Sequence, residues 1–323
     1  MVKIEGGRKP VFLFQFSEKN VMLDKTKSDK QFAINNELSF QQAQGDLTMI
    51  DIDNQYATAT ISLYGGQVLS YIPKKQTKDI LFVSDITKPE AGKAIRGGIP
   101  ICWPWFGNDT SGFGRPAHGF ARNLPWKKLK TINNSDGSTS VTLRLSNTEE
   151  TLAIWPHEFE LIIEITVGEQ LTVALTTKNN DIRDIVISQA LHSYFNVGDI
   201  SQVSVSGLDE ISYLDKLESY LLQEQKGDVV IEQEVDRVYQ NAPQAVKLVD
   251  KSLNRTINIK SQASNSTVVW NPWQENCAKF SDLSVDDYQH FLCIENANVF
   301  EDSVSIAAGE SHTLTAIFNV ENN

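Results

Sequence analysis

Short segments in which apolar and polar residues alternate recur along most of the chain. In FELIIEITV (159–167), Phe159, Leu161, Ile163 and Ile165 fall on one face of an extended strand, while two glutamates and a threonine fall on the other. This pattern predicts an antiparallel strand with one buried face.

Ten further segments have a similar strand-like character, and Gly, Asn and Asp residues stand between many of them. Helical periodicity is nearly absent. The many short strands predict an all-β fold, a large antiparallel β-sandwich. The ten segments are YATATISL (56–63), ILFV (80–83), VTLRL (141–145), LTVALTT (171–177), VVIE (229–232), AVKLV (245–249), RTINI (255–259), TVVW (267–270), FLCI (291–294) and TLTAIFNV (313–320).

The first part of the chain has a different composition. Residues 1–45 mix charged and amide side chains with one short apolar run at 11–16. We expect an N-terminal arm there that can add an edge strand. We expect residues 46–323 to form a single β-sandwich domain, because all-β domains often exceed about 200 residues.

The stretch 96–126, RGGIPICWPWFGNDTSGFGRPAHGFARNLPW, interrupts the strand pattern. Its four prolines and six glycines predict a loop, and its six aromatic residues predict that this loop is rigid. A rigid aromatic loop is typical of a binding site. The alternative is a structural loop that packs over a sheet and leaves its arginines in water. It carries Arg96, Arg115, His118 and Arg122.

The formal net charge of -12 limits the partners that we expect. A strongly acidic protein is repelled by nucleic-acid phosphates and by anionic membrane surfaces, so we expect neither as a partner. An anionic ligand would need a local cluster of arginines.

The three cysteines, Cys102, Cys277 and Cys293, show no spacing typical of a metal site or a disulfide framework, and we expect a reducing compartment. The N-terminus has no uninterrupted apolar core of a signal peptide, and no run of 18 apolar residues occurs. We therefore expect a cytoplasmic protein.

Two side chains stand out as candidates for acid–base chemistry. His192, in SQALHSYFNVGDI (188–200), shares a predicted strand face with Ala190 and Tyr194, so it is largely covered. A core histidine bonded to a carbonyl group has the same pattern.

Glu295 is the second candidate. It follows Phe291 and Cys293 on one face, where the strand is predicted to end at Asn296. Burial there would raise its pKa toward that of a general base, whereas a glutamate turned to water at a strand end would show no such shift.

Two other features are ambiguous. Asp215, in SYLDKL (212–217), is typical of a turn and would not be chosen on chemistry alone. Trp270 and Trp273 can either stack on a sugar ring or close the core.

Five motifs occur in one order that closely resembles the hexose-6-phosphate mutarotases, also called glucose-6-phosphate 1-epimerases, of the aldose 1-epimerase (galactose mutarotase-like) superfamily. The resemblance covers roughly residues 50 to 320. The motifs are RGGIPICWPWFG (96–107), PAHGFARNLPW (116–126), ALHSYFNVGDI (190–200), YLDK (213–216) and FLCIEN (291–296).

The resemblance implies a galactose mutarotase-like β-sandwich, with His192 and Glu295 as the catalytic pair. It implies that the substrate is bound by four residues, Arg96, His118, Arg122 and Asp215. Some relatives have glutamine where this chain has an alanine, at position 117.

The implied activity is interconversion of the α and β anomers of a hexose 6-phosphate, with glucose 6-phosphate as the preferred substrate. Glu295 would take the proton from the anomeric hydroxyl and His192 would protonate the ring oxygen. Arg96 and Arg122 would hold the phosphate. We expect no cofactor or metal, a small sugar phosphate as the only partner, and a monomer. Arg115 and the N-terminal arm match no family motif.

Three alternatives remain at this point. The chain can be an aldose 1-epimerase for unphosphorylated hexoses or a non-catalytic carbohydrate-binding protein. A glycoside hydrolase would need two carboxylates beside the scissile bond, and the motifs supply one.

Overall fold

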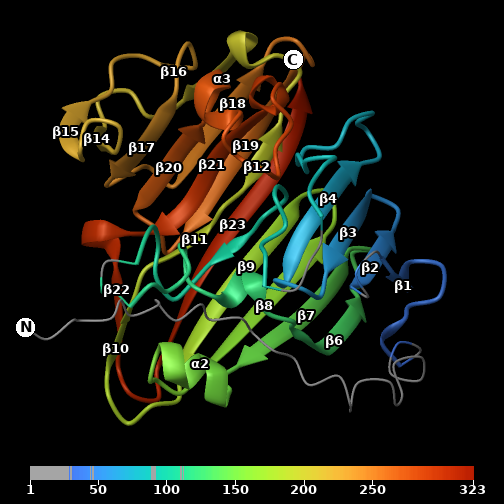
Figure 1. The fold of residues 1–323 in the computed structure, drawn as a ribbon. Helices are drawn as coiled ribbons and strands as arrows, with labels where there is room; N and C mark the ends of the chain where they lie inside the picture. The colour runs from blue at the N-terminus through green and yellow to red at the C-terminus, as the bar shows by residue number, and fades with distance from the viewer. Residues whose placement is uncertain are drawn as a thin grey trace, which may run out of the picture.

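Antiparallel sheets build most of this computed structural model, which describes residues 29, 31–43, 45, 47–88, 92–109, 111 and 113–323. Within those residues the sheets have nine, eight, four and two strands, and every strand pairing is antiparallel. Figure 1 shows the eight-stranded sheet at the upper left and β6–β9 of the nine-stranded sheet at the lower right. The predicted all-β sandwich is confirmed.

The two largest sheets supply the two layers of the sandwich. In spatial order, the nine-stranded sheet contains β16 (Val229–Val230), β13 (Val203–Ser206), β18 (Ala245–Asp250), β19 (Arg255–Gln262), β23 (Ser311–Asn322), β9 (Leu171–Asn179), β8 (Phe159–Val167), β7 (Thr139–Ser146) and β6 (Lys127–Asn133). The eight-stranded sheet contains β15 (Leu221–Glu224), β14 (Ser212–Asp215), β17 (Val235–Gln240), β20 (Ser266–Asn271), β21 (Phe291–Asn298), β11 (Gln189–Leu191) and β5 (Ile101–Cys102), with β12 (Tyr194–Asn196) also paired to β21.

The remaining elements are smaller. The four-stranded sheet contains β1 (Leu38–Gln42), β2 (Thr48–Asp53), β3 (Ala57–Ser62) and β4 (Gln67–Pro73), and the two-stranded sheet contains β10 (Ile185–Ile187) and β22 (Val304–Ile306). The helices whose full bounds the structure describes are α2 (Glu149–Ile154) and α3 (Trp273–Cys277), and the 3₁₀ turns are η3 (Ala121–Asn123), η4 (Ile200–Gln202), η5 (Asp287–Gln289) and η6 (Phe300–Asp302). No helix of the described residues is long and apolar enough to cross a membrane.

Most of the predicted strand segments lie in observed strands. The segment 159–167 is β8, residue for residue. The segment 229–232 is a strand only at Val229–Val230. The prediction for 80–83 is wrong, because Leu81 bridges to Phe195 and Val83 to Gly97, so no ladder forms with a single partner strand.

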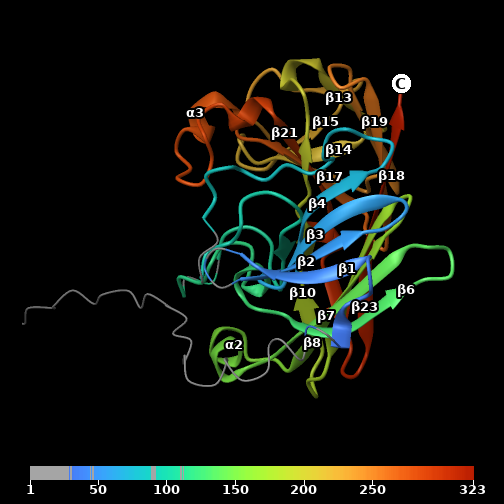
Figure 2. The same ribbon diagram turned by 90° about the vertical axis from the view of Figure 1, so that its right-hand side faces the viewer.

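The N-terminal region contributes the edge strand β1, which pairs with β2 in the four-stranded sheet (Figure 2). The apolar run at 11–16 lies outside the described residues.

One apolar cluster joins the inner faces of the sheets. It contains Ile163 of β8, Phe318 of β23, Ile61 of β3 and Ile294 of β21. On β21 the neighbours of Ile294 point the opposite way, and Cys293 belongs to a separate cluster. This alternation places the next side chain, Glu295, on the outer face of the eight-stranded sheet.

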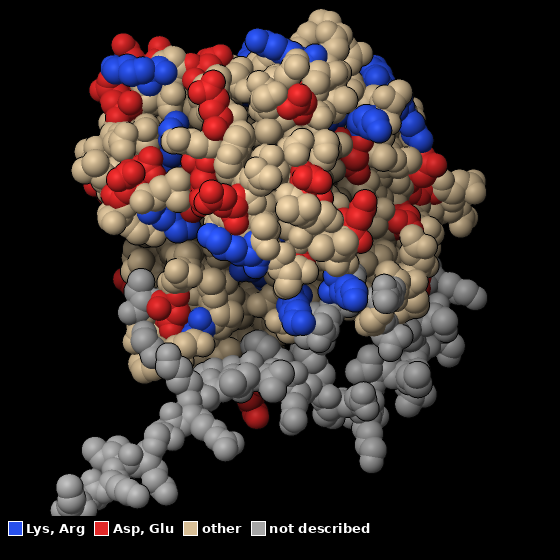
Figure 3. Space-filling model, turned by 45° about the horizontal axis from the view of Figure 1, so that its top comes forward, with Lys and Arg blue, Asp and Glu red and all other residues tan. Residues whose placement is uncertain are grey.

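The molecular surface carries both signs of charge. Figure 3 shows acidic and basic side chains interspersed over the face that it presents. The net charge of -12 is therefore not concentrated in one patch of that face.

Candidate functional site

A pocket of about 300 Å³ lies on the outer face of the eight-stranded sheet, under the loop 96–126. Its volume is near the lower end of the range for small-molecule sites, roughly 300–1,000 Å³. Five of the six predicted site residues line it. The lining residues are Arg96, Phe106, Ala117, His118, Arg122, His192, Lys216, Asp236, Trp270, Asn276, Phe280 and Glu295.

Glu295 lies in the middle of its strand, not at its end. β21 continues to Asn298, and Ala297 still pairs with Ser266 of β20. The asparagines do not end the strand, because Asn298 is buried and accepts a hydrogen bond from Gln189 Nε2 at 2.9 Å. The prediction of a strand-end glutamate is therefore wrong, but Glu295 is buried, with 1% of its surface exposed.

His192 lies between two strands that both pair with β21. Leu191 pairs with Asn296 and Tyr194 with Cys293, so the register is the same before and after the interruption. The same register places His192 opposite Glu295. The predicted shared face with Tyr194 is confirmed, since the two rings stack with centroids 4.9 Å apart.

The two candidate acid–base groups are in direct contact. His192 Nε2 lies 3.4 Å from Glu295 Oε1, and both residues are buried. Two atoms of the pair, His192 Nδ1 and Glu295 Oε2, have no hydrogen-bond partner among the described residues. These atoms leave the pair with capacity to bind a ligand.

Burial shifts the pKa values of the pair in opposite directions. Burial lowers the pKa of His192 well below its ordinary value, and Arg122 and Arg96 lower it further. Burial raises the pKa of Glu295 well above its usual range, and Asp236 raises it further, whereas Lys216 and Arg122 act against this rise. With no ligand bound, the surroundings favour the uncharged form of each group.

Two arginines from the loop 96–126 face the pocket. Arg96 is fixed by Asp282, whose Oδ2 accepts from Nε at 3.1 Å, and by Tyr194, whose hydroxyl lies 3.1 Å from Nη1. Its guanidinium also lies 4.8 Å from the centre of the Phe280 ring. Arg122, on η3, donates from Nη2 to the Ala117 carbonyl at 3.0 Å, and its buried Nε has no partner among the described residues.

His118 is held by its backbone. Its N–H donates to the Gly107 carbonyl at 2.7 Å, and its φ of 63° is in the left-handed region. The ring of His118 packs edge-on against the ring of His192, with centroids 5.8 Å apart and the ring planes at 65°. Burial lowers the pKa of His118 well below its ordinary value, as does Arg122, so this imidazole is neutral in the empty pocket.

Gly119, the residue after His118, allows the loop backbone to pack directly against the Trp103 carbonyl group. Gly119 has a φ of +73°, and a Cβ there would overlap the Trp103 carbonyl group. We expect Gly119→Ala to lower the free energy of unfolding by about 3 kcal/mol or more, from steric overlap added to backbone strain. Urea denaturation would measure this.

Gly114→Ala is the matched control. Gly114 has a φ of +71° but nothing within 4 Å of an added Cβ, so only backbone strain of about 1–2 kcal/mol is expected. Equal losses in the two variants would show that close packing at Gly119 is unimportant.

Arg115, which matches no family motif, does not line the pocket. Its side chain donates to Asp109 Oδ1 at 2.8 Å and 3.0 Å, and its guanidinium lies 4.2 Å from the centre of the Trp105 ring. Arg115 therefore closes the loop between residues 109 and 115.

Asp215 faces away from the pocket. It pairs with Arg237, which pairs with Val269, and Val269 belongs to the core between the sheets. The side chains of this row therefore point inward, and Asp215 Oδ2 lies 4.0 Å from Arg237 Nε. The structure does not bring Asp215 together with the other predicted site residues.

Two charged residues outside the predicted set, Lys216 and Asp236, line the pocket instead. Lys216 Nζ and Asp236 Oδ2 form an ion pair at 2.6 Å. Burial alone would lower the pKa of Lys216, but Asp236 raises it, so the ammonium is charged. No sequence signal marks Asp236, because the strand face that it shares with Val238 also carries the polar Gln240.

The two tryptophans have different positions. Trp270 lines the pocket, with its ring centroid 5.9 Å from that of His192. Trp273 packs against the main core and Tyr288. Asn276, on α3, and Phe280, shortly after it, complete the pocket wall. No sequence pattern identifies either residue as part of a site.

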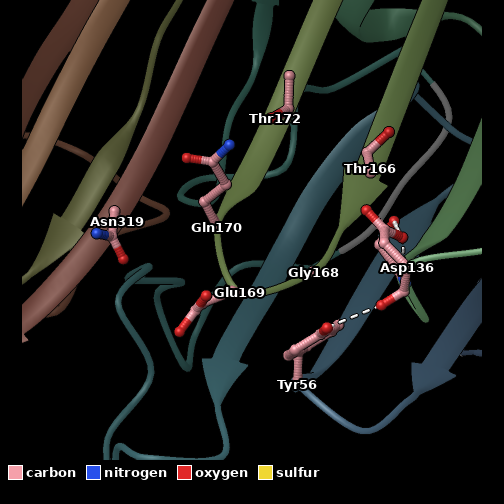
Figure 4. A pocket seen from close by; sticks show the side chains of 9 residues that line it. Tyr56, Asp136, Thr166, Gly168, Glu169, Gln170, Thr172 and Asn319 are labelled. Atoms are coloured by element: carbon pink, nitrogen blue, oxygen red, sulfur yellow. Dashed lines mark hydrogen bonds between the residues drawn. The ribbon is translucent and has the colours of Figure 1, made fainter.

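A second pocket of about 370 Å³ is lined by residues of the nine-stranded sheet and nearby loops (Figure 4). Thr166, Thr172 and Asn319 point outward there from the nine-stranded sheet, and the Tyr56 hydroxyl donates to the Asp136 carbonyl at 2.8 Å. Its lining contains two carboxylates, Asp136 and Glu169, but no Lys, Arg or His. This pocket therefore lacks the charge needed to bind an anion.

All three cysteines are buried free thiols. Burial raises the pKa of Cys102 to about 12. Within the described residues, no group of three or more His, Cys, Asp and Glu side chains is placed to hold a metal ion.

Comparison with known proteins gives one consistent result. The family model described as aldose 1-epimerase matches residues 48–319. A protein of Salmonella typhimurium (strain LT2), provisionally named glucose-6-phosphate 1-epimerase, is 38% identical over 255 residues, which cover 77% of this chain and 83% of the relative. A Cenchrus ciliaris protein with the same provisional name is 37% identical over 265 residues, covering 78% of each chain.

Solved structures agree. A crystal structure from Salmonella typhimurium, provisionally described as a mutarotase, superposes with a TM-score of 0.83 at 32% identity, covering 90% of this chain and 96% of the other. The crystal structure of HI1317 superposes with a TM-score of 0.75 at 29% identity, covering 90% and 97%.

Proposed function

The chain belongs to the aldose 1-epimerase family, and we propose on that basis that it is an isomerase that interconverts the α and β anomers of a hexose 6-phosphate, with glucose 6-phosphate as the preferred substrate. The observation that carries this proposal is the contact between His192 and Glu295 in a pocket that also contains Arg96, Arg122 and Lys216.

The proposed reaction requires proton transfers only. Glu295 takes the proton from the anomeric hydroxyl while His192 gives a proton to the ring oxygen, and the bond between C1 and the ring oxygen breaks to give the open aldehyde. Rotation about the C1–C2 bond then presents the other face of the aldehyde. The same groups act in reverse to close the ring.

The cations of the pocket favour a phosphorylated sugar. A phosphomonoester carries a charge of about -1.5 to -2 at neutral pH. Arg122 has donors that remain free, and Arg96 is fixed at the pocket wall by Asp282 and Tyr194. Planar guanidinium groups held in this way suit bidentate phosphate contacts.

NMR exchange spectroscopy of anomer interconversion tests the proposal. Glucose 6-phosphate and glucose would be compared at equal enzyme concentration, with the spontaneous and buffer-catalysed rates subtracted. Strong acceleration of the phosphorylated sugar is expected. Equal acceleration of both sugars would indicate an epimerase for unphosphorylated hexoses, and acceleration of neither would contradict an epimerase function.

Substituting Asp236 and Asp215 one at a time tests which of the two carboxylates contacts the sugar. Asp236→Asn is expected to lower kcat/KM for glucose 6-phosphate by about tenfold or more, since hydrogen bonds to charged groups contribute about 1.5–3 kcal/mol. Asp215→Asn should leave kcat/KM within about twofold, because Asp215 faces the core. Steady-state kinetics on both variants would measure this, and the opposite ranking would favour Asp215 as the sugar ligand.

The pH dependence of kcat/KM, which reports the ionisation of the free enzyme, should be bell-shaped around neutral pH. The reactive pair holds one proton, so a second proton at low pH disables Glu295 as a base, and loss of the last proton at high pH disables His192 as an acid. Because burial lowers the pKa of His192, the second proton binds only at lower pH. Because burial raises the pKa of Glu295, the last proton is lost only at higher pH, so the rate maximum is broad. A kcat/KM that rises steadily into alkaline solution would contradict this acid–base pair.

A further inference from the structure

We propose that the phosphate group of the substrate also activates the acid–base pair, because its negative charge moves the shared proton from Glu295 to His192. This inference rests on the proposed function and extends it. In this view the phosphate affects turnover of the bound sugar as well as binding.

The geometry permits such a transfer. Only the 3.4 Å between Glu295 Oε1 and His192 Nε2 separates the two possible positions of the proton. One arrangement has two neutral groups, and the other has an imidazolium beside a carboxylate. The total number of protons is the same, so the surroundings decide which arrangement is populated.

In the empty pocket the surroundings favour the neutral arrangement. His192 is enclosed by the rings of His118, Tyr194 and Trp270, none of which carries a negative charge. Below the pocket lie the neutral thiols of Cys102 and Cys293, whose pKa values burial raises. Burial in these surroundings disfavours an isolated charge on either partner.

The cations disfavour an imidazolium at His192 but favour a carboxylate at Glu295, and they are paired to different degrees. Lys216 is paired with Asp236 and Arg96 with Asp282. Arg122 donates a side-chain hydrogen bond to the Ala117 carbonyl, and within the described residues no carboxylate lies within ion-pair distance of it. Arg122 is thus an uncompensated positive charge that opposes an imidazolium at His192.

A bound dianion reverses this balance. When its oxygens accept hydrogen bonds from Arg122 and Arg96, their positive charge is neutralised. Because C6 is attached to the carbon next to the ring oxygen, the phosphate lies nearer to His192 than to Glu295, so it stabilises the imidazolium more than it destabilises the carboxylate. The proton leaves Glu295 Oε1 and binds His192 Nε2, and no other bond changes. The result is an ionised base and a protonated acid, which is the arrangement that ring opening requires.

A substrate supplied in two pieces tests this idea. The full-length protein would be given glucose as the sugar and sodium phosphite as the separate dianion, with sodium chloride at equal ionic strength as the reference and enzyme-free samples as blanks. Phosphite is expected to raise kcat/KM for glucose in a saturable manner by about tenfold or more, as one pKa unit of differential stabilisation corresponds to tenfold.

Two variants complete this experiment. In Arg122→Met the response to phosphite should fall below about twofold relative to the same variant without phosphite, because the anion loses a guanidinium partner. Lys75→Met removes an equal charge from an exposed surface pair with Glu169 and should respond as the wild type does. An undiminished response to phosphite in Arg122→Met would overturn the proposal.

A spectroscopic measurement separates proton transfer from simple ordering of the pocket. In ¹⁵N-histidine NMR, with the His192 signal assigned by its absence in His192→Gln, saturating phosphite should shift His192 to the imidazolium position. A neutral His192 under saturating phosphite would overturn the proposal, even if turnover rose. If glucose 6-phosphate is turned over but phosphite has no effect on glucose, the activation is wrong and the proposed function stands. If glucose 6-phosphate is not turned over, the proposed function itself fails.

Discussion

Glu295→Gln is expected to lower kcat for glucose 6-phosphate by about 10²- to 10⁴-fold, which is the usual contribution of a positioned general base. Glutamine keeps the shape of the side chain but cannot take a proton at neutral pH. The substitution also places a neutral amide where burial already favours a neutral carboxyl, so the fold should not be weakened. The loss should therefore appear in kcat with little change in thermal stability.

Exchange NMR at saturating substrate would measure the loss. Glu164→Gln provides the control, because it makes the same chemical change on an exposed position of β8. Wild-type turnover in Glu295→Gln would show that another group takes the proton from the anomeric hydroxyl.

Arg122→Met is expected to lower kcat/KM for glucose 6-phosphate by roughly 10- to 100-fold, because hydrogen bonds to charged groups contribute about 1.5–3 kcal/mol. Methionine retains much of the apolar stem, so packing against the loop is largely kept. With the phosphate contact removed, kcat/KM for glucose should not fall.

The comparison of the two sugars is the decisive part of this experiment. Equal losses for glucose and glucose 6-phosphate would show that Arg122 acts through its hydrogen bond to Ala117, by holding the loop in place. Lys75→Met again controls for the change in net charge.

The sequence was sufficient to predict the class of the fold and most of its strands. Segments with strict alternation, such as β8, were predicted well because one face of each strand packs on the core. The segment 80–83 was misread because an apolar run does not reveal whether a single partner strand is available.

The position of the pocket residues depended on strand faces that the sequence leaves open. Asp215 and Lys216 are adjacent, so they point to opposite sides, and only Lys216 reaches the pocket. Asp236 comes from another strand, and its place beside Lys216 follows from sheet order, which local patterns do not specify. The contact between His192 and Glu295 likewise depends on the register with β21.

That register has a consequence for how such an enzyme can change over evolutionary time. The proton-transferring pair is fixed by the backbone ladder of one sheet, whereas the charged residues that would select the ligand come largely from the loop 96–126 and the turn after β14. Insertions or substitutions in those connections can alter which sugar is accepted without disturbing the pair. Selectivity and chemistry can therefore diverge independently, and a descendant could exchange the phosphate for another group while keeping the same reaction.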